Sequence, residues 1–333
     1  MAARPFAWSF AQFVCLIREP VPPTMKIVYC SSAGAAQPWI EGLAGALPGA
    51  EVWAWDAQAE ARSADYAVVW SPPAAFFASQ PALKAIFNIG AGVDGVLSAG
   101  AFPPDVPVVR LNDAGMAVQM AEYVIHALVS HARRFDVYEA HACADEWRPM
   151  QPIERAAFPV GVMGLGSIGA RVARAVAALD YPVYGWSRSP KSIDGISCMS
   201  GAAQLDTFLR AVRVLVCVLP LTPATENILD RRNLMLLRPH GYVINVARGR
   251  HLVEEDLLAL IQDGTLAGAT LDVFREEPLR PDHPFWRNPN ITITPHIAAI
   301  TLRDESIAQI VAKLAALQRG DAVDGCVELA RGY

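Results

Sequence analysis

The chain has 333 residues, a formal net charge of −5, 53% hydrophobic residues and 18% charged residues. This length suffices for two domains with separate cores, and the mild charge without a Lys/Arg run gives little support to binding of nucleic acid or membranes. Six cysteines without a Cys-x-x-Cys pair and seven histidines without a His-x-x-x-His pair favour reduced thiols in the cytoplasm and give no support to a metal site.

The N-terminal stretch FAWSFAQFVCLI is apolar and is followed by Arg18-Glu19 and a Pro-rich segment. It is short for a membrane span. Only Arg4 precedes it and no small-x-small cleavage site follows, so it departs from the pattern of a secretory signal peptide. We therefore expect residues 1–24 to be a flexible extension and the folded chain to begin at Met25.

Residues 25–112 contain five short apolar runs: KIVYC, EVWAW, YAVVW, AIFNI and VPVVRL. Ala- and Leu-rich segments and turns rich in Gly and Pro separate them. Continuous apolar strands that alternate with helices are typical of a parallel sheet covered on both faces. We expect one α/β unit here.

The next segment predicts a helical stretch over residues 116–142, with a long helix near residues 117–135, because apolar residues recur at Met120, Val124, Ala127 and Leu128. Its length suits a connector that leaves one domain and packs on something else, such as a second subunit. We expect a C2 homodimer.

A second series of strands begins at residue 158 and predicts six strands: FPVGVMG, YPVYGW, VRVLVCVL, GYVINVA, AGATLDVF and ITITPH. Six strands with helical spacers fit a complete doubly wound sheet. The helical tail DESIAQIVAKLAALQRG is too short for a domain of its own, and we expect it to pack on the first unit.

A Gly-x-Gly-x-x-Gly turn joins the first strand of this series to the helix ARVARAVAAL. This context is typical of a dinucleotide-binding turn, although an ordinary βα turn is the alternative. The first glycine allows the tight turn, the second lets backbone N–H groups approach a pyrophosphate, and the third allows close packing of helix and strand. The expected contacts are Gly164, Leu165, Gly166, Ser167, Ile168 and Gly169.

The acidic residue that usually binds the adenosine ribose, about 20 residues further on, is missing. Residues 185–189 read GWSRS, and Lys191 follows. Arginine near this position accommodates a 2′-phosphate, and two hydroxyls with two cations can surround such an anion. The pattern favours NADP(H), with weaker binding of NAD(H), over a merely solvated basic turn. The expected contacts are Ser187, Arg188, Ser189 and Lys191.

Charged residues stand at the ends of the last three strands, where ligands of open parallel sheets bind. Arg248 offers a planar fork for a carboxylate and a carbonyl oxygen, and it stabilises the alkoxide that develops there. His296 can donate a proton to that oxygen, and Glu277 can hold the imidazole and favour its charged form. Each residue alone could be a surface charge, but together they indicate reduction of a 2-oxo acid.

The motifs GLGSIG, LPLTPAT, NVARG, LDVFREEPL and TPHIAA occur in this order and resemble the D-isomer-specific 2-hydroxyacid dehydrogenase family. The similarity extends from Met25 to the C-terminus. AVVWSPP, GAGVD, WSR, HLVEEDLL, TPHIAAIT and the terminal RGY are most similar to the bacterial glyoxylate/hydroxypyruvate reductases A of that family.

The resemblance implies NADPH-dependent reduction of glyoxylate and hydroxypyruvate to glycolate and D-glycerate. It assigns the catalytic roles to Arg248, Glu277 and His296 and places Asp272 near the nicotinamide carboxamide. It also implies further cofactor contacts in two of the motifs, at Leu219, Pro220 and Ala247.

The resemblance further implies that backbone N–H groups of Gly92 and Val93 bind the substrate carboxylate. Trp70 and Met116 are expected near the substrate, although large apolar residues are more often core. Many family members follow the histidine with Gly-Gly or Gly-Ser, whereas this chain has Ala298-Ala299. This larger wall leaves the size of the substrate open.

We therefore expect an α/β protein of two doubly wound parallel-sheet domains. The NADP-binding Rossmann domain is expected over residues 113–296, and a flavodoxin-like substrate or lid domain over residues 25–112 and 297–333. Trp147 is expected either to reach the active site of a partner subunit, as in related hydroxypyruvate reductases, or to pack locally.

Two other functions stay open from the sequence. One is another D-2-hydroxyacid dehydrogenase of the phosphoglycerate or lactate type. The other is a dinucleotide-binding module like the transcriptional corepressors that keep this fold. The preferred oxo acid and the direction of the reaction in the cell also stay open.

Overall fold

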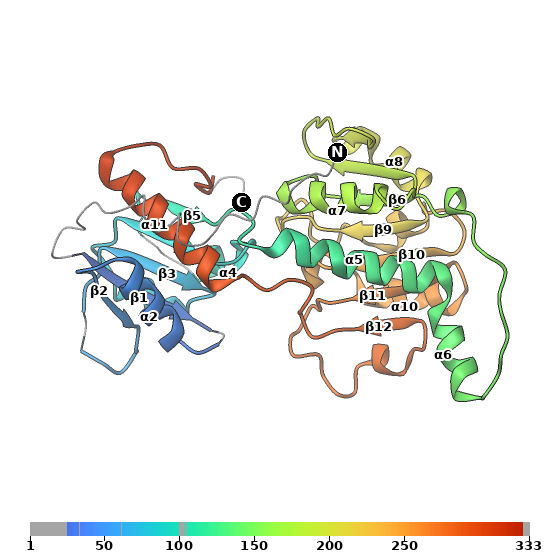
Figure 1. The fold of residues 1–333 in the computed structure, drawn as a ribbon, viewed down its shortest axis with the longest axis horizontal. Helices are drawn as coiled ribbons and strands as arrows, with labels where there is room; N and C mark the ends of the chain where they lie inside the picture. The colour runs from blue at the N-terminus through green and yellow to red at the C-terminus, as the bar shows by residue number, and fades with distance from the viewer. Residues whose placement is uncertain (1–24, 33, 61, 100–102, 104, 329–333) are drawn as a thin grey trace, which may run out of the picture.

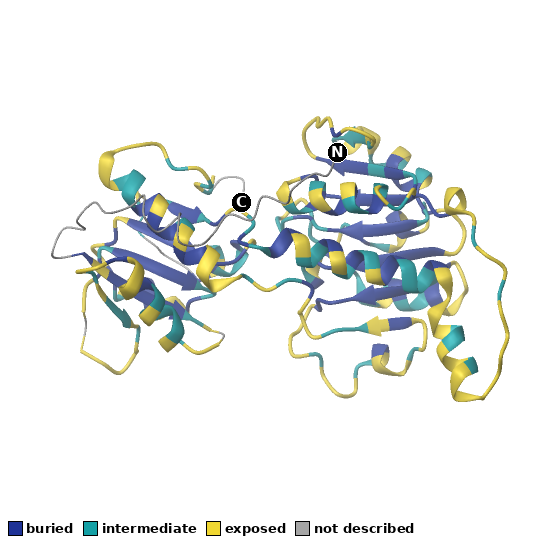
Figure 2. Ribbon diagram, viewed as in Figure 1, coloured by how far each residue is buried: buried dark blue, intermediate teal, exposed yellow. Residues whose placement is uncertain are grey.

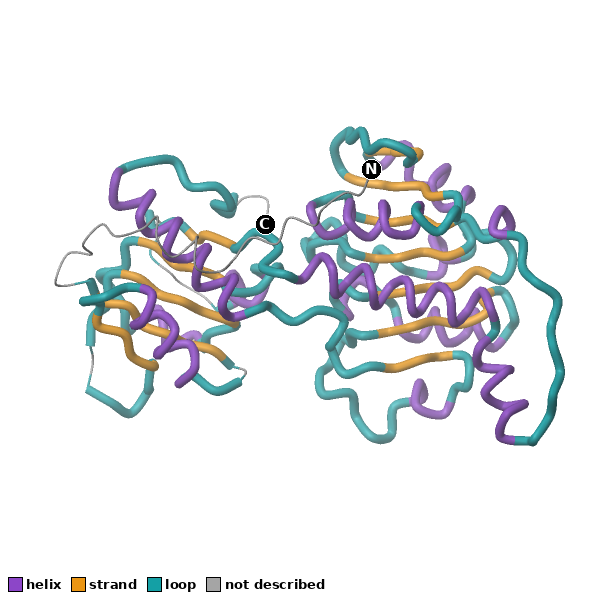
Figure 3. The backbone as a smooth tube through the Cα atoms, viewed as in Figure 1, coloured by secondary structure: helices purple, strands orange, loops and turns teal. Residues whose placement is uncertain are grey.

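The computed structural model describes residues 25–32, 34–60, 62–99, 103 and 105–328. The extension predicted for residues 1–24 lies outside this described part. Two α/β units lie side by side in Figure 1, and the chain passes between them twice. Strands and helices alternate along both units (Figure 3).

The first unit contains a sheet of five parallel strands in the order β2-β1-β3-β4-β5. This is the strand order of a flavodoxin-like sheet. Its helices before the first crossing are α2 (Gln37–Ala46), α3 (Ala74–Ala78) and α4 (Asp94–Ser98). The strands are β1 (Lys26–Ser31), β2 (Glu51–Ala54), β3 (Tyr66–Trp70), β4 (Ala85–Asn88) and β5 (Val108–Arg110).

Alternate residues of these strands belong to two separate cores, because successive side chains of a strand point to opposite faces of the sheet. Ile27 and Val68 belong to one core, whereas Val28 and Val69 belong to the other. Figure 2 shows the buried strands between more exposed helices. Burial on both faces explains why these runs are continuously apolar.

The last helix, α11 (Arg303–Arg319), completes the first unit. Its buried residues Ile307, Ile310 and Leu314 belong to the same core as Ile27. The helix lies beside α2 in Figure 1, although more than 250 residues separate the two in sequence. The domain boundaries at residues 112 and 296 stay a prediction.

The second unit contains seven parallel strands in the order β12-β11-β10-β9-β6-β7-β8. This is the order of a Rossmann sheet with one more strand at its edge. The strands are β6 (Val160–Met163), β7 (Val183–Ser187), β8 (Ser197–Ser200), β9 (Val214–Cys217), β10 (Gly241–Asn245), β11 (Leu266–Leu271) and β12 (Ile291–Ile293).

The prediction of six strands in this unit was wrong, because it omitted β8. This strand reads SCMS and pairs only with β7 at the edge of the sheet. Its residues are exposed or half-buried. An edge strand buries little apolar surface, so it leaves no apolar run in the sequence.

The helical stretch predicted over residues 116–142 is not one continuous helix, and its long helix near residues 117–135 corresponds to α5 (Met116–Arg133). A second helix, α6 (Phe135–Cys143), follows α5, and Arg134 in the left-handed conformation separates the two. The apolar face of α5 packs on α7 (Ser167–Ala177) as far as Ala132. No residue of α6 is buried. The core on which α5 packs therefore ends near Ala132, and the chain beyond it has no core to follow.

The remaining helices of this unit are α8 (Leu205–Ala211), α9 (Arg231–Leu234) and α10 (Glu254–Gln262). Three of the four described 3₁₀ turns lie between strands: Ala202–Gln204, Gly249–His251 and Pro284–Arg287. The fourth, Arg155–Ala157, precedes β6. None of the described helices has the length and apolar character that crossing a membrane requires.

Two glutamines clasp the segments that connect the units. The side-chain amide of Gln119 on α5 donates to the carbonyl of Ile300 at 2.8 Å and accepts from its N–H at 3.1 Å. Gln309 on α11 makes the same two-point contact with Asn112, at 2.8 Å in both directions. The N–H of Leu302 also donates to the carbonyl of Ala114. The two crossings are therefore bound to each other.

Replacing Ile310 with Ala should loosen the first unit selectively, because this fully buried side chain of α11 packs in its core. Such a truncation typically lowers the free energy of unfolding by about 2–5 kcal/mol. Hydrogen exchange should rise in β1 and β3 and stay unchanged in β10. The exposed Gln318→Ala on the same helix is the control and should stay within about 0.5 kcal/mol of wild type. Equal loosening of both sheets would contradict this packing.

Candidate active site

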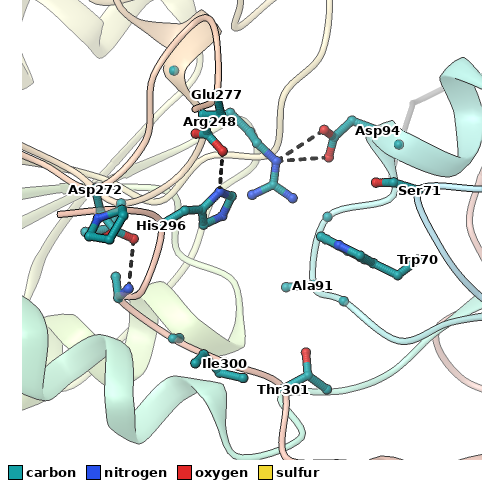
Figure 4. A pocket seen from close by; sticks show the side chains of 18 of the residues that line it. Trp70, Ser71, Ala91, Asp94, Arg248, Asp272, Glu277, His296, Ile300 and Thr301 are labelled. Atoms are coloured by element: carbon teal, nitrogen blue, oxygen red, sulfur yellow. Dashed lines mark hydrogen bonds and ion pairs between the residues drawn. The ribbon is translucent and has the colours of Figure 1, made fainter. Parts of the chain in front are cut away.

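A cleft of about 1140 Å³ opens between the two units. The first unit contributes Trp70, Gly92 and Asp94 to its wall, and the second contributes Arg248, Glu277 and His296. Figure 4 shows Arg248 between His296 and Asp94. Three more of the predicted site residues line the cleft: Met116, Ile168 and Asp272. Ala298, which follows His296 in the chain by two positions, also lines it.

Arg248 follows β10 and extends its side chain toward the first unit. Its Nη1 donates to the carbonyl of Ala247 at 2.7 Å. Its Nε lies 3.3 and 3.2 Å from the two carboxylate oxygens of Asp94. A Cβ built on Gly249 would lie 1.8 Å from the carbonyl carbon of Phe274. Only glycine fits after this arginine, because the loop lies directly against the end of β11.

Two side chains that were not predicted from the sequence hold the loop of Arg248. Asn245 donates to the carbonyl of Arg248 at 3.1 Å. The buried imidazole of His251 places Nδ1 3.1 Å from the same carbonyl and Nε2 3.2 Å from the carbonyl of Pro220. Burial lowers the pKa of His251. A neutral imidazole carries one N–H, so it donates to one of these two carbonyls.

His296 and Glu277 form the second functional pair of the cleft. Nδ1 of His296 lies 2.8 Å from Oε2 of Glu277, and Oε1 of Glu277 accepts from the N–H of Phe274 at 2.9 Å. The hydrogen bond to Glu277 raises the pKa of His296, although burial acts against it. Burial acts to raise the pKa of Glu277, but its hydrogen bonds to His296 and Phe274 outweigh this and lower it. The pair therefore favours a charged imidazole beside a carboxylate.

The turn that carries His296 is held by the buried carboxylate of Asp272. Oδ1 accepts from the hydroxyl of Thr294 at 2.6 Å and from the N–H of Ile297 at 2.8 Å. Oδ2 accepts from the N–H of Ala298 at 2.8 Å. His296 itself has a φ of 56°, which non-glycine residues rarely adopt. Asp272 lines the cleft, but its carboxylate is already engaged by the turn.

A further contact joins this turn to the connector helix. The hydroxyl of Tyr123 on α5 lies 2.5 Å from Oγ1 of Thr294. Burial raises the pKa of Tyr123 to about 12, so the phenol keeps its proton. Tyr123, Thr294 and Asp272 thus form a chain of hydrogen bonds that ends at the turn of His296. Only Asp272 among these three residues was predicted from the sequence.

The wall formed by the first unit depends on close approach at two glycines. A Cβ on Gly90 would lie 1.8 Å from the ring of Trp70, and a Cβ on Gly92 would lie 2.0 Å from Nη2 of Arg248. The buried Asn88 donates to the carbonyls of Gly90 and Gly92 at 2.8 and 2.9 Å. The N–H of Val93 points away from Asn88, since it is opposite to the Gly92 carbonyl in a trans peptide. Val93 is buried and does not line the cleft.

The glycine turn after β6 has the geometry of a phosphate cradle. Gly164 has a φ of 104°, and a Cβ on Gly169 would lie 1.8 Å from the Gly164 carbonyl oxygen. No atom lies within 4 Å of a Cβ built on Gly166, which precedes the first turn of α7. The space at the N-terminus of an eleven-residue helix is therefore open. Backbone N–H groups and the helix dipole suit a pyrophosphate there.

The basic turn after β7 lies next to the glycine turn. The N–H of Gly164 donates to the carbonyl of Trp186 at 2.8 Å, so the ends of β6 and β7 are joined. Ser187 is buried and its hydroxyl donates to the carbonyl of Ser189 at 2.8 Å. Arg188, Ser189 and Lys191 are exposed. These residues lie outside the lining of the cleft.

The other predicted cofactor contacts follow β9 and β10. Leu219 and Ala247 are buried, and Pro220 is half-buried. The carbonyl of Pro220 accepts from the hydroxyl of Thr225 at 2.7 Å and faces His251. Leu165, Ser167 and Ile168 lie in the glycine turn and the first turn of α7. Ile168 lines the cleft and therefore connects the glycine turn with it.

The chain is similar to known proteins over most of its length. Residues 125–298 match the sequence profile of the D-isomer specific 2-hydroxyacid dehydrogenase NAD binding domain. A glyoxylate/hydroxypyruvate reductase A from Serratia proteamaculans is 45% identical over 314 residues, which are 93% of this chain and 100% of that protein.

Two solved structures are also similar. A D-isomer specific 2-hydroxyacid dehydrogenase from Xanthobacter autotrophicus, in complex with NADPH and MES, has a TM-score of 0.88 and 37% identity. The match covers 93% of this chain and 99% of that one. An NADPH-dependent glyoxylate/hydroxypyruvate reductase from Sinorhizobium meliloti, in complex with NADP and sulfate, has a TM-score of 0.87 and 38% identity. That match covers 93% of this chain and 100% of the other.

Replacing Glu277 with Gln should lower the pKa of His296, because the hydrogen bond that raises this pKa would lose its negative charge. The imidazole should then lose its proton at a lower pH than in wild type. An NMR titration of the His296 ring measures this shift. An unchanged pKa of His296 would mean that another group holds its charge.

Proposed function

The chain belongs to the D-isomer-specific 2-hydroxyacid dehydrogenase family, and we propose that it reduces glyoxylate and hydroxypyruvate to glycolate and D-glycerate with NADPH. One observation carries the proposal: Arg248, Glu277 and His296 meet in one cleft beside a glycine turn that suits a dinucleotide. The names of the Serratia and Sinorhizobium proteins support the choice of substrates and cofactor.

Arg248 binds and orients the oxo acid in this proposal. Its Nη groups face the cleft near Gly92, where the substrate carboxylate and the C2 carbonyl oxygen would lie. The guanidinium stabilises the negative charge that develops on that oxygen. The bound NADPH supplies the hydride for C2.

His296 donates the proton to the C2 oxygen. Its Nδ1 is engaged by Glu277, so Nε2 remains to face the substrate. The raised pKa increases the fraction of His296 that carries the proton at a given pH. The reduction rate should therefore fall as the pH rises through the pKa of His296.

The substrate is small in this proposal. Ala298 and Ala299 of the second unit and Trp70 of the first unit line the cleft. A wall of methyl groups and an indole suits a short oxo acid of two or three carbons better than a long side chain.

NADP(H) is held by the two adjoining turns in this proposal. The glycine turn Gly164–Gly169 would hold the pyrophosphate, with Leu219, Pro220 and Ala247 along the rest of the dinucleotide. Ser187, Arg188, Ser189 and Lys191 would surround the 2′-phosphate. The adjacency of β6 and β7 supports this assignment, because it brings the two phosphate sites together.

We also propose that the protein is a cytoplasmic homodimer. The helix α6 and its following loop extend away from the second unit in Figure 1. No residue of α6 is buried, and Trp147 in that loop is 96% exposed. Phe135, the first residue of α6, is exposed as well. A second copy that covers this arm would bury them, and Trp147 could then approach the partner's cleft. The described cysteines are free thiols, as expected in the cytoplasm.

The purified protein should oxidise NADPH when glyoxylate or hydroxypyruvate is added, and the loss of the NADPH absorbance would follow the reaction. Pyruvate and oxaloacetate, tested with both cofactors, distinguish this reaction from those of other 2-hydroxyacid dehydrogenases. Dinucleotide binding without turnover of any oxo acid would instead indicate a binding module of the corepressor kind.

Replacing Arg188 with Ala should weaken the binding of NADPH and leave the binding of NADH unchanged. A hydrogen bond to a charged group contributes roughly 1.5–3 kcal/mol, so the KM for NADPH should rise about ten- to a hundredfold. The kcat at saturation should change little, because the phosphate is remote from the reacting atoms. Arg210→Ala, an exposed position on α8, removes the same charge and is the control. An equal rise in the KM for NADPH and for NADH would contradict a 2′-phosphate site.

The wild-type protein should elute as a dimer at micromolar concentration, as measured by light scattering. Replacing Phe135 and Trp147 with Ser should shift it toward the monomer, because the arm would lose apolar surface. Replacing Trp286 with Ser, an exposed tryptophan outside the arm, is the control and should leave the dimer intact. A monomeric wild type would exclude the proposed assembly.

A further inference from the structure

One ion pair joins the two units across the cleft, between Asp94 of α4 and Arg248 after β10. Among the ion pairs of described residues, no other connects the two units. Nε of Arg248 lies 3.2 and 3.3 Å from the two oxygens of Asp94. Both side chains are half-buried and line the cleft.

The contacts of Arg248 fix the direction of its fork. A guanidinium has five N–H groups. The Nε–H is taken by Asp94, and one Nη1–H is taken by the carbonyl of Ala247. Of the three that remain, two lie on the Nη1–Nη2 edge, which points into the cleft in Figure 4. A Cβ built on Gly92 would lie 2.0 Å from Nη2. Asp94 therefore contacts the guanidinium through Nε and leaves the Nη1–Nη2 edge available to a substrate carboxylate.

The contact between Asp94 and Arg248 depends on the position of the two units relative to each other. Asp94 belongs to the first unit and Arg248 to the second, so the pair exists only when the cleft has the width seen here. A wider cleft would leave Arg248 with Ala247 as its remaining partner. The orientation of Arg248 is thus coupled to closure of the cleft.

We propose that Asp94 is a positioning residue that aims Arg248 at the substrate when the cleft is closed. This inference rests on the proposed function, since it concerns the group that binds the oxo acid. Asp94 touches neither the substrate nor the reacting atoms in this role. It acts through Nε of Arg248.

Replacing Asp94 with Ala should lower kcat/KM for glyoxylate by about a hundredfold, because a misplacement of roughly 1 Å can cost that much. At least tenfold of the loss should appear in kcat, since Arg248 stabilises charge that develops during the reaction. Asp94→Asn keeps one oxygen acceptor and should lose less. The KM for NADPH should not change. Asp56→Ala removes an exposed acid of the same unit and is the matched control.

A double-mutant cycle with Arg248→Lys tests whether Asp94 acts through Nε. Lysine has no such group, so Asp94→Ala should change kcat/KM by less than about threefold in that background. Additive losses would overturn the proposal and assign Asp94 a general structural role.

Binding of oxalate to the protein without dinucleotide provides a readout that needs no turnover. Removing a negative charge from the cleft should by itself strengthen the binding of an anion such as oxalate. A positioning role predicts the opposite, namely that oxalate binds at least fivefold more weakly to Asp94→Asn than to wild type. Tighter binding would overturn the proposal, because Asp94 would then compete with the substrate for Arg248. A wild type that binds oxalate but does not reduce glyoxylate would contradict the proposed function alone.

Discussion

The carboxylate of Asp272 is buried at the carboxyl end of β11, and a buried charge must be compensated by hydrogen bonds. Three donors compensate it, and all three lie on the turn after β12: the hydroxyl of Thr294 and the N–H groups of Ile297 and Ala298. This requirement fixes a turn in which His296 adopts a left-handed backbone conformation. This turn sets the position of His296 relative to Glu277. It also sets where the second crossing segment starts.

The site is therefore assembled from two parts with different supports. His296 and Glu277 are fixed within the second unit, whereas Arg248 is fixed by Asn245 from below and by Asp94 from the opposite unit. The clasps of Gln119 and Gln309 bind the two crossings to each other, so the units can change their angle only by bending both crossings together. A small change at this hinge alters the cleft wall of the first unit but not the histidine pair.

Local patterns in the sequence were enough to select the candidate site residues. The glycine spacing, the basic turn and the charged strand ends each lie within a few residues, so Gly166, Arg188 and His296 could be selected without a structure. The residues that hold them could not. Asp94 and Arg248 are 154 residues apart, and Tyr123 and Thr294 are 171 apart. Nothing in a linear pattern reports such contacts. The same reason explains β8 and the break at Arg134, which depend on where the core ends.

The return of α11 to the first unit has a consequence for synthesis on the ribosome. The core around Ile27 lacks Ile310 and Leu314 until nearly the whole chain has been translated. The second unit, by contrast, is continuous from α5 to β12 and can close its core earlier. The half that is made first should thus be completed last, against the usual order in which N-terminal domains fold first. For much of translation, the part of this apolar face of the first sheet which α2 does not cover would be exposed, and a chaperone that binds apolar surfaces could bind there.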